Sequence, residues 1–346
     1  MEATASGNII PTRHNTVAER WPGRREQRLQ TLLRKAREIS WRRFGKKITF
    51  YLPGMIRHGS EQGSYPAISI TGSNCELGCD HCGGKILASM IRAVTPEELV
   101  QKCQAFARRG AIGCLLTGGS NRRGIMPWDD FVDAIAEVKW TTGLYVAIHT
   151  GIMPRTTALK LKAAKVDQAL VDLIGSDDTV RDVYHLDGGV ELVRETMRAL
   201  TDAGIETAPH IVVGLHYGTI LGEYEAIRMA GEFDVPTLVF VVLTSLKGAS
   251  MEGVTPPNAE EVAELIALAR VKLPRTVISL GCERSRGVEG TRTELLAIDA
   301  GVNRIAIQSD AAIEHAKAYG LDIRYQKSCC SMGLLGEGAV EHTALP

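Results

Sequence analysis

The chain has 346 residues, of which 45% are hydrophobic and 23% charged, as expected for a soluble globular protein with a substantial core. Its 40 basic and 40 acidic residues cancel, so net charge indicates no general preference for nucleic acid or for acidic membranes. With no apolar run behind a basic start, and no stretch near the ~18 apolar residues of a membrane span, the sequence predicts a cytoplasmic protein without a membrane partner.

The first predicted element is a basic amphipathic helix. Residues 1–20 are polar and aperiodic, whereas residues 20–47 are rich in Arg and Lys and carry apolar Leu29, Leu32, Leu33, Ala36 and Ile39 at helical spacing. A solvated charged face is the ordinary interpretation, and docking of an acidic carrier domain is the functional alternative. RNA binding is a third, but no aromatic-interleaved basic motif supports it. We assign residues 1–50 to an N-terminal extension.

Eight short β-type runs follow and alternate with helical patterns. The strand candidates are residues 67–71, 113–117, 144–149, 168–173, 207–213, 237–243, 277–280 and 304–307. Helical patterns lie between them, such as 96–108, with Pro near its start, and 188–203, just before Gly204. This alternation predicts an α/β fold, a (β/α)8 barrel of parallel strands over residues 51–325. An open partial barrel with a separate C-terminal unit is an alternative.

Chemistry in parallel barrels takes place at the carboxyl ends of the strands. A cysteine-rich loop follows the first strand candidate, Gly118 and Gly119 follow the second, His149 ends the third and Cys282 follows the seventh. Residues 326–346 form a cysteine-containing tail, which we expect to fold over the mouth of the barrel. The candidate functional residues should therefore meet at one rim.

The loop after the first strand contains Cys75, Cys79 and Cys82, which we call the first cysteine group. Three thiolates in one short loop can wrap one corner of an iron–sulfur cube and leave one iron open. Structural zinc is the competing interpretation, because His81 can supply a fourth ligand.

The Cys-x3-Cys-x2-Cys spacing of this loop resembles the signature of the radical S-adenosylmethionine (SAM) superfamily. The resemblance implies a [4Fe-4S] cluster whose open iron binds SAM and releases a 5'-deoxyadenosyl radical, with the protein supplying orientation. Gly118 and Gly119 resemble the family's glycine pair, whose backbone approaches the methionine part of SAM. Ser120 stands where an acidic residue often follows, and a plain turn is the alternative interpretation of the Gly-Gly pair.

Cys282, Cys329 and Cys330 form a second cysteine group. Buried thiols or a strained vicinal disulfide are the simple interpretations. A second, auxiliary cluster that faces the first is the functional one. Further partners considered for it are Cys114, if it points inward from its strand, Ser285 as an oxygen ligand, and Arg284 and Arg286 as anion binders. Cys103 lies on a predicted helix and is interpreted as structural.

The arrangement from Pro66 to Met332 resembles the biotin-synthase-like group and is similar to the two-protein, archaeal-type lipoyl synthases. The resemblance implies radical sulfur insertion into an octanoyl chain on a lipoyl-carrier domain, with sulfur from an auxiliary cluster. It also implies a related second radical SAM enzyme as partner and an electron donor such as ferredoxin or flavodoxin. The N-terminal cysteine motif and the C-terminal Arg-Ser-Ser-Tyr of ordinary lipoyl synthases are lacking, which disfavours the single-protein type.

Two other classes compete with this hypothesis. One is a biotin-synthase-like radical enzyme that performs rearrangement or cofactor biosynthesis; the other is a non-enzymatic iron–sulfur electron-transfer or zinc protein. His149, His210 and His216 lie near strand ends, where each could contact cofactor or substrate, although single histidines are more often structural. Asp172, at the end of the fourth strand, is a candidate for binding ribose hydroxyls.

Overall fold

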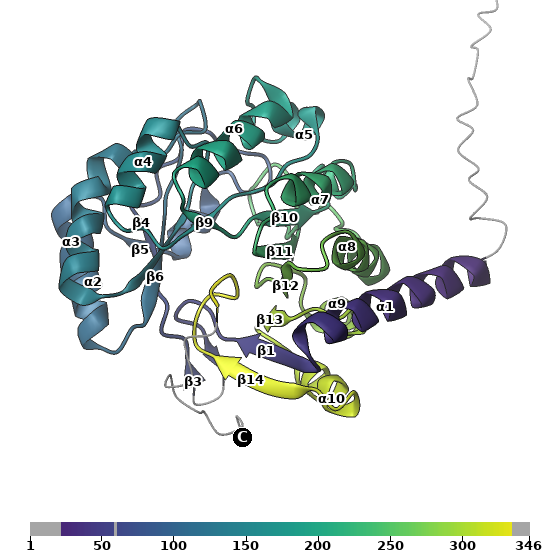
Figure 1. Cartoon of the computed structure of the whole chain (residues 1–346). Helices are drawn as coiled ribbons and strands as arrows, with labels where there is room; N and C mark the ends of the chain where they lie inside the picture. The colour runs from purple at the N-terminus through teal and green to yellow at the C-terminus, as the bar shows by residue number, and fades with distance from the viewer. Residues whose placement is uncertain (1–21, 59–60, 334–346) are drawn as a thin grey trace, which may run out of the picture.

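The computed structural model describes residues 22–58 and 61–333, and parallel strands form its inner wall (Figure 1). One six-stranded sheet contains β4 (Ala67–Ser69), β5 (Ile91–Arg92), β6 (Gly113–Thr117), β7 (Tyr145–His149), β8 (Gln168–Leu170) and β9 (Glu206–Thr207), in the order β5-β4-β6-β7-β8-β9. The other contains β1 (Lys47–Tyr51), β10 (His210–Val213), β11 (Thr237–Val242), β12 (Val277–Leu280), β13 (Arg304–Ala306) and β14 (Asp322–Gln326), in the order β10-β11-β12-β13-β1-β14. Seven of the eight predicted strands correspond to single strands, whereas the predicted strand 207–213 is divided between the end of β9 and β10, which belong to different sheets.

The two sheets are joined where β8 meets the chain that forms β9 and β10. A parallel bridge links Asp172 to His210, and the backbone N–H of Leu173 donates to the carbonyl oxygen of His210 at 2.7 Å. β5 and β14 are the edge strands of the joined wall. A closed eight-stranded barrel is therefore not observed, and the fold is a wall of two partial parallel sheets.

Three strands of this wall, β1, β5 and β14, were not predicted. β1 pairs with both β13 and β14, so a strand near the N-terminus lies between two strands from the end of the chain. β5 pairs with the outer side of β4. A short antiparallel hairpin, β2 (Arg57–His58) and β3 (Glu61–Gln62), stands apart from the wall.

Helices cover the outside of the wall. They are α1 (Pro22–Phe44), α2 (Pro96–Arg108), α3 (Val132–Thr142), α4 (Arg155–Ala163), α5 (Asp177–Asp182), α6 (Gly189–Asp202), α7 (Glu223–Glu232), α8 (Ala259–Lys272), α9 (Gly287–Asp299) and α10 (Asp310–Ala318), with 3-10 turns η2 (Lys85–Ser89) and η3 (Trp128–Phe131). The predicted helices at 96–108 and 188–203 correspond to α2 and α6. No helix among residues 22–58 and 61–333 is long and apolar enough to cross a membrane.

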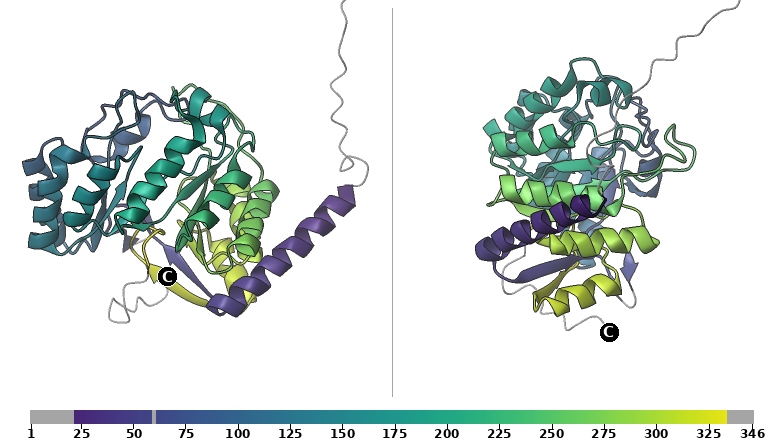
Figure 2. Two further views of the ribbon diagram at one scale, coloured as in Figure 1. Left: turned by 45° about the horizontal axis from the view of Figure 1, so that its top comes forward. Right: turned by 90° about the vertical axis from the view of Figure 1, so that its right-hand side faces the viewer.

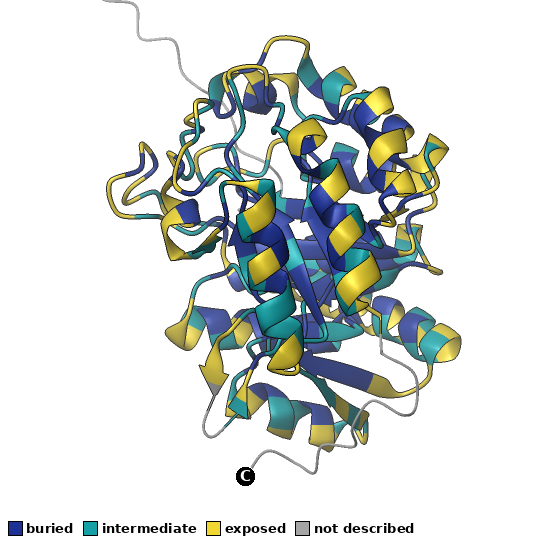
Figure 3. Ribbon diagram, turned by 90° about the vertical axis from the view of Figure 1, so that its left-hand side faces the viewer, coloured by how far each residue is buried: buried dark blue, intermediate teal, exposed yellow. Residues whose placement is uncertain are grey.

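Local sequence signals explain several helix starts. The Thr95 hydroxyl accepts the backbone N–H of Glu98 at 3.2 Å, and Pro96 occupies the first turn of α2. Asn258 and Glu261 form a reciprocal capping box at the start of α8. The central strands are buried on both faces, as in β11, where all six residues are buried. Figure 3 shows buried strands inside a layer of helices whose outer turns are exposed. The inner faces of the helices therefore close the core from outside.

The predicted basic helix is α1, and it packs on the molecule rather than standing free. Figure 2 shows it lying across α8 and α9, with its N-terminal end projecting beyond them. Leu33 and Ala36 are buried on its inner face. The Arg37 guanidinium donates to the carbonyl oxygen of Asp299 at 3.1 Å and lies 4.6 Å from the ring centroid of Tyr319.

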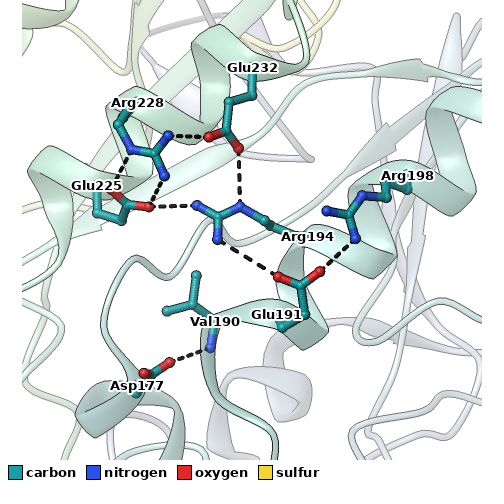
Figure 4. A network of polar contacts seen from close by, with 8 residues as sticks. All are labelled: Asp177, Val190, Glu191, Arg194, Arg198, Glu225, Arg228 and Glu232. Carbon is teal, nitrogen blue, oxygen red and sulfur yellow. Dashed lines mark hydrogen bonds and ion pairs between the residues drawn. The ribbon is translucent and has the colours of Figure 1, made fainter.

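A network of ion pairs fastens α6 to α7, close to the joint between the two sheets (Figure 4). Arg194 lies at its centre and contacts Glu225 at 2.5 Å and Glu232 at 3.1 Å. Arg228 binds the same two carboxylates from within α7. Since α6 precedes β9 and α7 follows β10, this network holds the helices on both sides of the joint.

Candidate functional site

The loop that carries the first cysteine group (residues 75–82, the cysteine loop) lies against the carboxyl end of β6. The carbonyl oxygen of Ser120 accepts the backbone N–H groups of Glu76 at 2.9 Å and Leu77 at 3.2 Å. The Cys75 thiol also points at this oxygen, at 3.9 Å. The segment that begins with Gly118 and Gly119 thus supports the start of the cysteine loop.

Gly119 is required by this close approach. A Cβ atom there would lie 2.0 Å from the Asn74 carbonyl oxygen and 2.5 Å from the Cα of Cys75. Its backbone N–H donates to the Thr71 hydroxyl at 2.6 Å. At Gly118 a Cβ would only touch the side chains of Thr71 and Ile70, at 3.1 and 3.2 Å. Gly119 is therefore the member of the pair that the contact with the cysteine loop requires.

Cys79, His81 and Cys82 form an electrostatic unit within the loop. The Cys79 thiol donates a hydrogen bond to Cys82, which lowers the pKa of Cys82 to about 4 and raises that of Cys79, and the neighbouring His81 favours the Cys82 thiolate further. His81 Nδ1 is buried without a hydrogen-bond partner. Thiolate character is what iron binding requires of a cysteine.

The second cysteine group comes together from two distant parts of the chain. Cys282 follows the end of β12, while Cys329 and Cys330 follow β14, and Cys282 and Cys330 pack in one apolar cluster. A hydrogen bond from Cys330 lowers the pKa of the Cys329 thiol to about 6. Burial, together with the nearby Cys329, raises the pKa of Cys282 to about 11.

The described part of the C-terminal tail does not cover the mouth, so that prediction is wrong for residues 326–333. The Gln168 side chain and Arg304 both donate to the carbonyl oxygen of Ser331, at 3.2 and 3.1 Å, and the Ser279 hydroxyl donates to that of Cys330 at 3.0 Å. Because Gln168, Ser279 and Arg304 all belong to strands of the two sheets, these contacts hold the tail inside the wall. Residues 334–346 lie outside the described residues.

Both cysteine groups line one cavity of about 820 Å³. Most of its lining is apolar, with residues such as Leu115, Leu170, Val212 and Val241. Among the described residues, no three His, Cys, Asp or Glu side chains converge on the position of a single metal ion. A cluster with several irons needs thiolates spread around a wider space than a single metal ion does. Three features fit such a cluster: the thiols of the first cysteine group, the His81 nitrogen that has no hydrogen-bond partner, and the close backbone approach at Gly119.

Several residues considered for the second group do not line this cavity. Cys114 is fully buried and its thiol contacts Cys103 of α2, so it points outward from β6 and packs in the core. Ser285 is not part of the lining. Arg284 pairs with Glu294 at 2.6 Å and donates to three carbonyl oxygens, which makes it a structural residue rather than an anion binder.

Arg286 and His216 are also placed outside the cavity. Arg286 donates to the carbonyl oxygens of Cys282 and Ile307, at 2.6 and 3.3 Å. His216 Nδ1 lies 3.3 Å from the Thr179 hydroxyl, and its ring is 5.3 Å from that of Tyr217. Both therefore hold loops together.

A polar cluster stands in the apolar lining between the two cysteine groups. His149 Nε2 lies 3.3 Å from one carboxylate oxygen of Asp172, and the Tyr184 hydroxyl donates to the other at 3.3 Å. Burial disfavours the charged forms of both His149 and Asp172. Their mutual attraction outweighs this effect, because Asp172 raises the pKa of His149 and His149 lowers the pKa of Asp172. His210 Nδ1 faces the carbonyl oxygen of Ala208, and burial lowers its pKa to about 4. With both its oxygens engaged inside the protein, Asp172 is poorly placed to bind ribose.

Sequence reasoning missed Tyr65 and Tyr184. Both line the cavity, and the Tyr65 hydroxyl is buried without a hydrogen-bond partner in the same apolar cluster as Cys329. Tyr184 stacks beside His81, with ring centroids 5.3 Å apart. Neither lies in a predicted strand or motif, so only the three-dimensional fold reveals their position.

Comparison with known structures shows the same fold in two enzymes. The chain superposes on the crystal structure of methylornithine synthase with a TM-score of 0.61 at 16% identity, covering 87% of this chain and 90% of that one. It superposes on the X-ray structure of the FeFe-hydrogenase maturase HydG from Carboxydothermus hydrogenoformans with a TM-score of 0.62 at 16% identity, covering 85% and 72%. At these identities the likeness concerns the fold alone.

Comparison with protein families identifies the domain that holds the first cysteine group. No curated protein sequence matches the chain. Residues 69–223 match the model of the Radical SAM superfamily, and this segment contains the cysteine loop, the glycine pair and the His149–Asp172 pair. This segment of the chain is therefore similar to a radical SAM superfamily domain, and the similarity implies a [4Fe-4S] cluster and SAM as cofactors.

Proposed function

We propose that this protein inserts sulfur into unactivated C–H bonds of a carrier-bound octanoyl chain, as a component of a lipoyl synthase. The observation that carries the proposal is the presence of two separate cysteine groups in the lining of one cavity. A radical formed on a substrate carbon must meet a sulfur source before it can react elsewhere. A second sulfur-rich group across the same cavity meets that requirement.

The first cysteine group fits the SAM cluster. Cys75, Cys79 and Cys82 would hold it, while Gly118, Gly119 and Ser120 would lie beside bound SAM. When bound, these cofactors supply a carbon radical that removes a hydrogen atom from the substrate. The protein's own part is orientation, because Gly119 fixes the cysteine loop and the apolar lining excludes water around the reacting carbon.

The second cysteine group fits an auxiliary cluster that donates sulfur. The low pKa of Cys329 favours its thiolate, and the partnerless Tyr65 hydroxyl provides a hydrogen bond that an introduced sulfur or thiolate can accept. The apolar lining suits an octanoyl chain, which offers no polar group along its length. The partners would be the octanoylated carrier domain, a second radical SAM enzyme that adds the other sulfur, and ferredoxin or flavodoxin as electron donor.

The test is a turnover assay with a defined substrate. An octanoyl-lysyl peptide is incubated anaerobically with the reconstituted protein, reductant and SAM, and the products are analysed by mass spectrometry. We expect 5'-deoxyadenosine together with a peptide that has gained one sulfur atom. The Cys282→Ala, Cys329→Ala and Cys330→Ala triple variant should still form 5'-deoxyadenosine but no sulfur-containing peptide.

A different radical SAM reaction is the second candidate. The likeness in fold to methylornithine synthase, which extends over 90% of that chain, favours a rearrangement or cofactor biosynthesis. Formation of 5'-deoxyadenosine without sulfur transfer, in both the wild type and the triple variant, would contradict sulfur insertion and support this class.

A further inference from the structure

Asp80 lies between two cysteines of the first group, and its side chain connects the cysteine loop to two other loops. The Tyr217 hydroxyl donates to one carboxylate oxygen at 2.6 Å. His185 Nε2 lies 3.1 Å from the other. Tyr217 belongs to the loop after β10, and His185 to the loop between α5 and α6.

Both partners of Asp80 have backbone conformations that non-glycine residues seldom adopt. The φ angle is +56° at His185 and +49° at Tyr217, in the left-handed region. This region is unfavourable for side chains with a Cβ, and residues remain in it where the surrounding structure holds them there. Two loops are therefore bent in the same unusual way, and each bend brings a side chain to the same carboxylate.

The backbone of Asp80 adds contacts to the same side of the cavity. Its N–H donates to the carbonyl oxygen of Val183 at 3.0 Å, and its carbonyl oxygen accepts the N–H of Met251 at 3.2 Å. Met251 lies in the loop between β11 and α8. The cysteine loop is thus bound at its start to Ser120 and at Asp80 to three loops on the other side.

We infer that Asp80 is a positioning residue, which fixes Cys79, His81 and Cys82 relative to the opposite wall of the cavity. The loops that Asp80 joins carry Tyr184, Leu186 and Leu246 of the cavity lining. A shift of the cysteine loop would change the distance between a bound cofactor and these residues. The inference rests on the first cysteine group as a cofactor site and does not require sulfur insertion.

A role in global stability predicts a different outcome from a positioning role. The side chain of His185 is 47% exposed and Tyr217 is 41% exposed. Polar contacts at such positions contribute little to the free energy of unfolding. Loss of the Asp80 contacts should therefore loosen four loops locally and leave the unfolding transition of the whole chain almost unchanged.

The experiment uses Asp80→Ala and Tyr217→Phe, with Tyr224→Phe as control. Tyr224 is 53% exposed on neighbouring α7 and does not line the cavity. Hydrogen exchange is measured on the full chain without metal. We expect both variants, but not the control, to exchange about tenfold faster in residues 75–90, 183–188, 214–219 and 244–254. In the Asp80→Ala background, Tyr217→Phe should add only the loss of the hydrogen bond from the Tyr217 hydroxyl to the carbonyl oxygen of Asp182 at 3.1 Å.

SAM cleavage provides the functional measurement. After reconstitution, the two variants should keep the iron content of the wild type while the KM for SAM rises about fivefold and kcat changes less. Unchanged exchange in the three partner loops, or an unchanged KM for SAM, would overturn the inference. If the wild type itself does not cleave SAM, the cofactor assignment fails instead, and the exchange data still decide whether Asp80 joins the loops.

Discussion

At Gly119 a single hydrogen atom in place of a side chain decides whether the cysteine loop can reach β6. Gly119→Ala places a methyl group against the backbone of Asn74 and Cys75, which cannot move without displacing a thiol. We expect a loss of about 1–3 kcal/mol in the free energy of unfolding and a clear loss of iron after reconstitution. Gly118→Ala is the matched control, since its methyl group meets only side chains. Equal iron in both variants would contradict this account.

His210 should make stability depend on pH in a definite direction. Its pKa is about 4 in the folded protein and about 6.5 in an unfolded chain, so only the unfolded state takes up a proton between these values. Stability is therefore lost as pH falls from 6.5 to 4, by at most about 3 kcal/mol from this group.

Urea unfolding of the metal-free wild type and the His210→Gln variant, at several pH values, measures this effect. The difference between the two proteins should stay constant from pH 7 to 9 and change in favour of the variant below pH 6.5. Parallel curves down to pH 4 would show that His210 is protonated in the folded protein.

The inward or outward direction of a side chain decides one alternative that the sequence left open, the role of Cys114. Leu115 and Thr117 line the cavity, so Cys114 and Leu116 point outward, because side chains alternate along a strand. The alternation was present in the sequence, but it did not reveal which face was the inner one. Thr117, at the end of the strand beside the glycine pair, fixes that face once the site is known.

Among the elements, the loop that carries Cys282 is held by one buried ion pair. Arg284 and Glu294 are 1% and 5% exposed, and they connect this loop to α9. Arg284→Met leaves the Glu294 carboxylate buried without its partner, so we expect a loss of about 3–5 kcal/mol in urea unfolding. Arg181→Met, which removes exposed ion pairs on α5, should leave the urea midpoint almost unchanged. Similar losses in the two variants would contradict this assignment.

The sequence predicted elements better than their arrangement. The eight strands have runs of β-branched and apolar residues that are recognisable locally, and α2 and α8 carry their own capping residues. β1 and β14 were not predicted. β14 (Asp322–Gln326) has no buried residue, so its sequence lacks the apolar run of a central strand. Their place in the sheet depends on pairing between the two ends of the chain, which no local pattern encodes.

For the whole molecule, the main correction concerns the C-terminal tail. The sequence analysis predicted that the tail with Cys329 and Cys330 covers the mouth of the barrel. In the structure, residues 328–332 lie inside the wall, in contact with side chains of four strands: Tyr51, Gln168, Ser279 and Arg304. These contacts are distant in sequence and could not be predicted from spacing. They nevertheless place the second cysteine group in the same cavity as the first, which the sequence did predict.

The central claim is that this one cavity holds two cysteine-bound clusters. Iron and sulfide analysis with Mössbauer spectra, after anaerobic reconstitution, tests it most directly. The account predicts about eight irons in the wild type. It predicts about four in either triple Ala variant, that of Cys75, Cys79 and Cys82 or that of Cys282, Cys329 and Cys330. About four irons in the wild type, all lost with the first group and none with the second, would contradict the claim and remove the sulfur source.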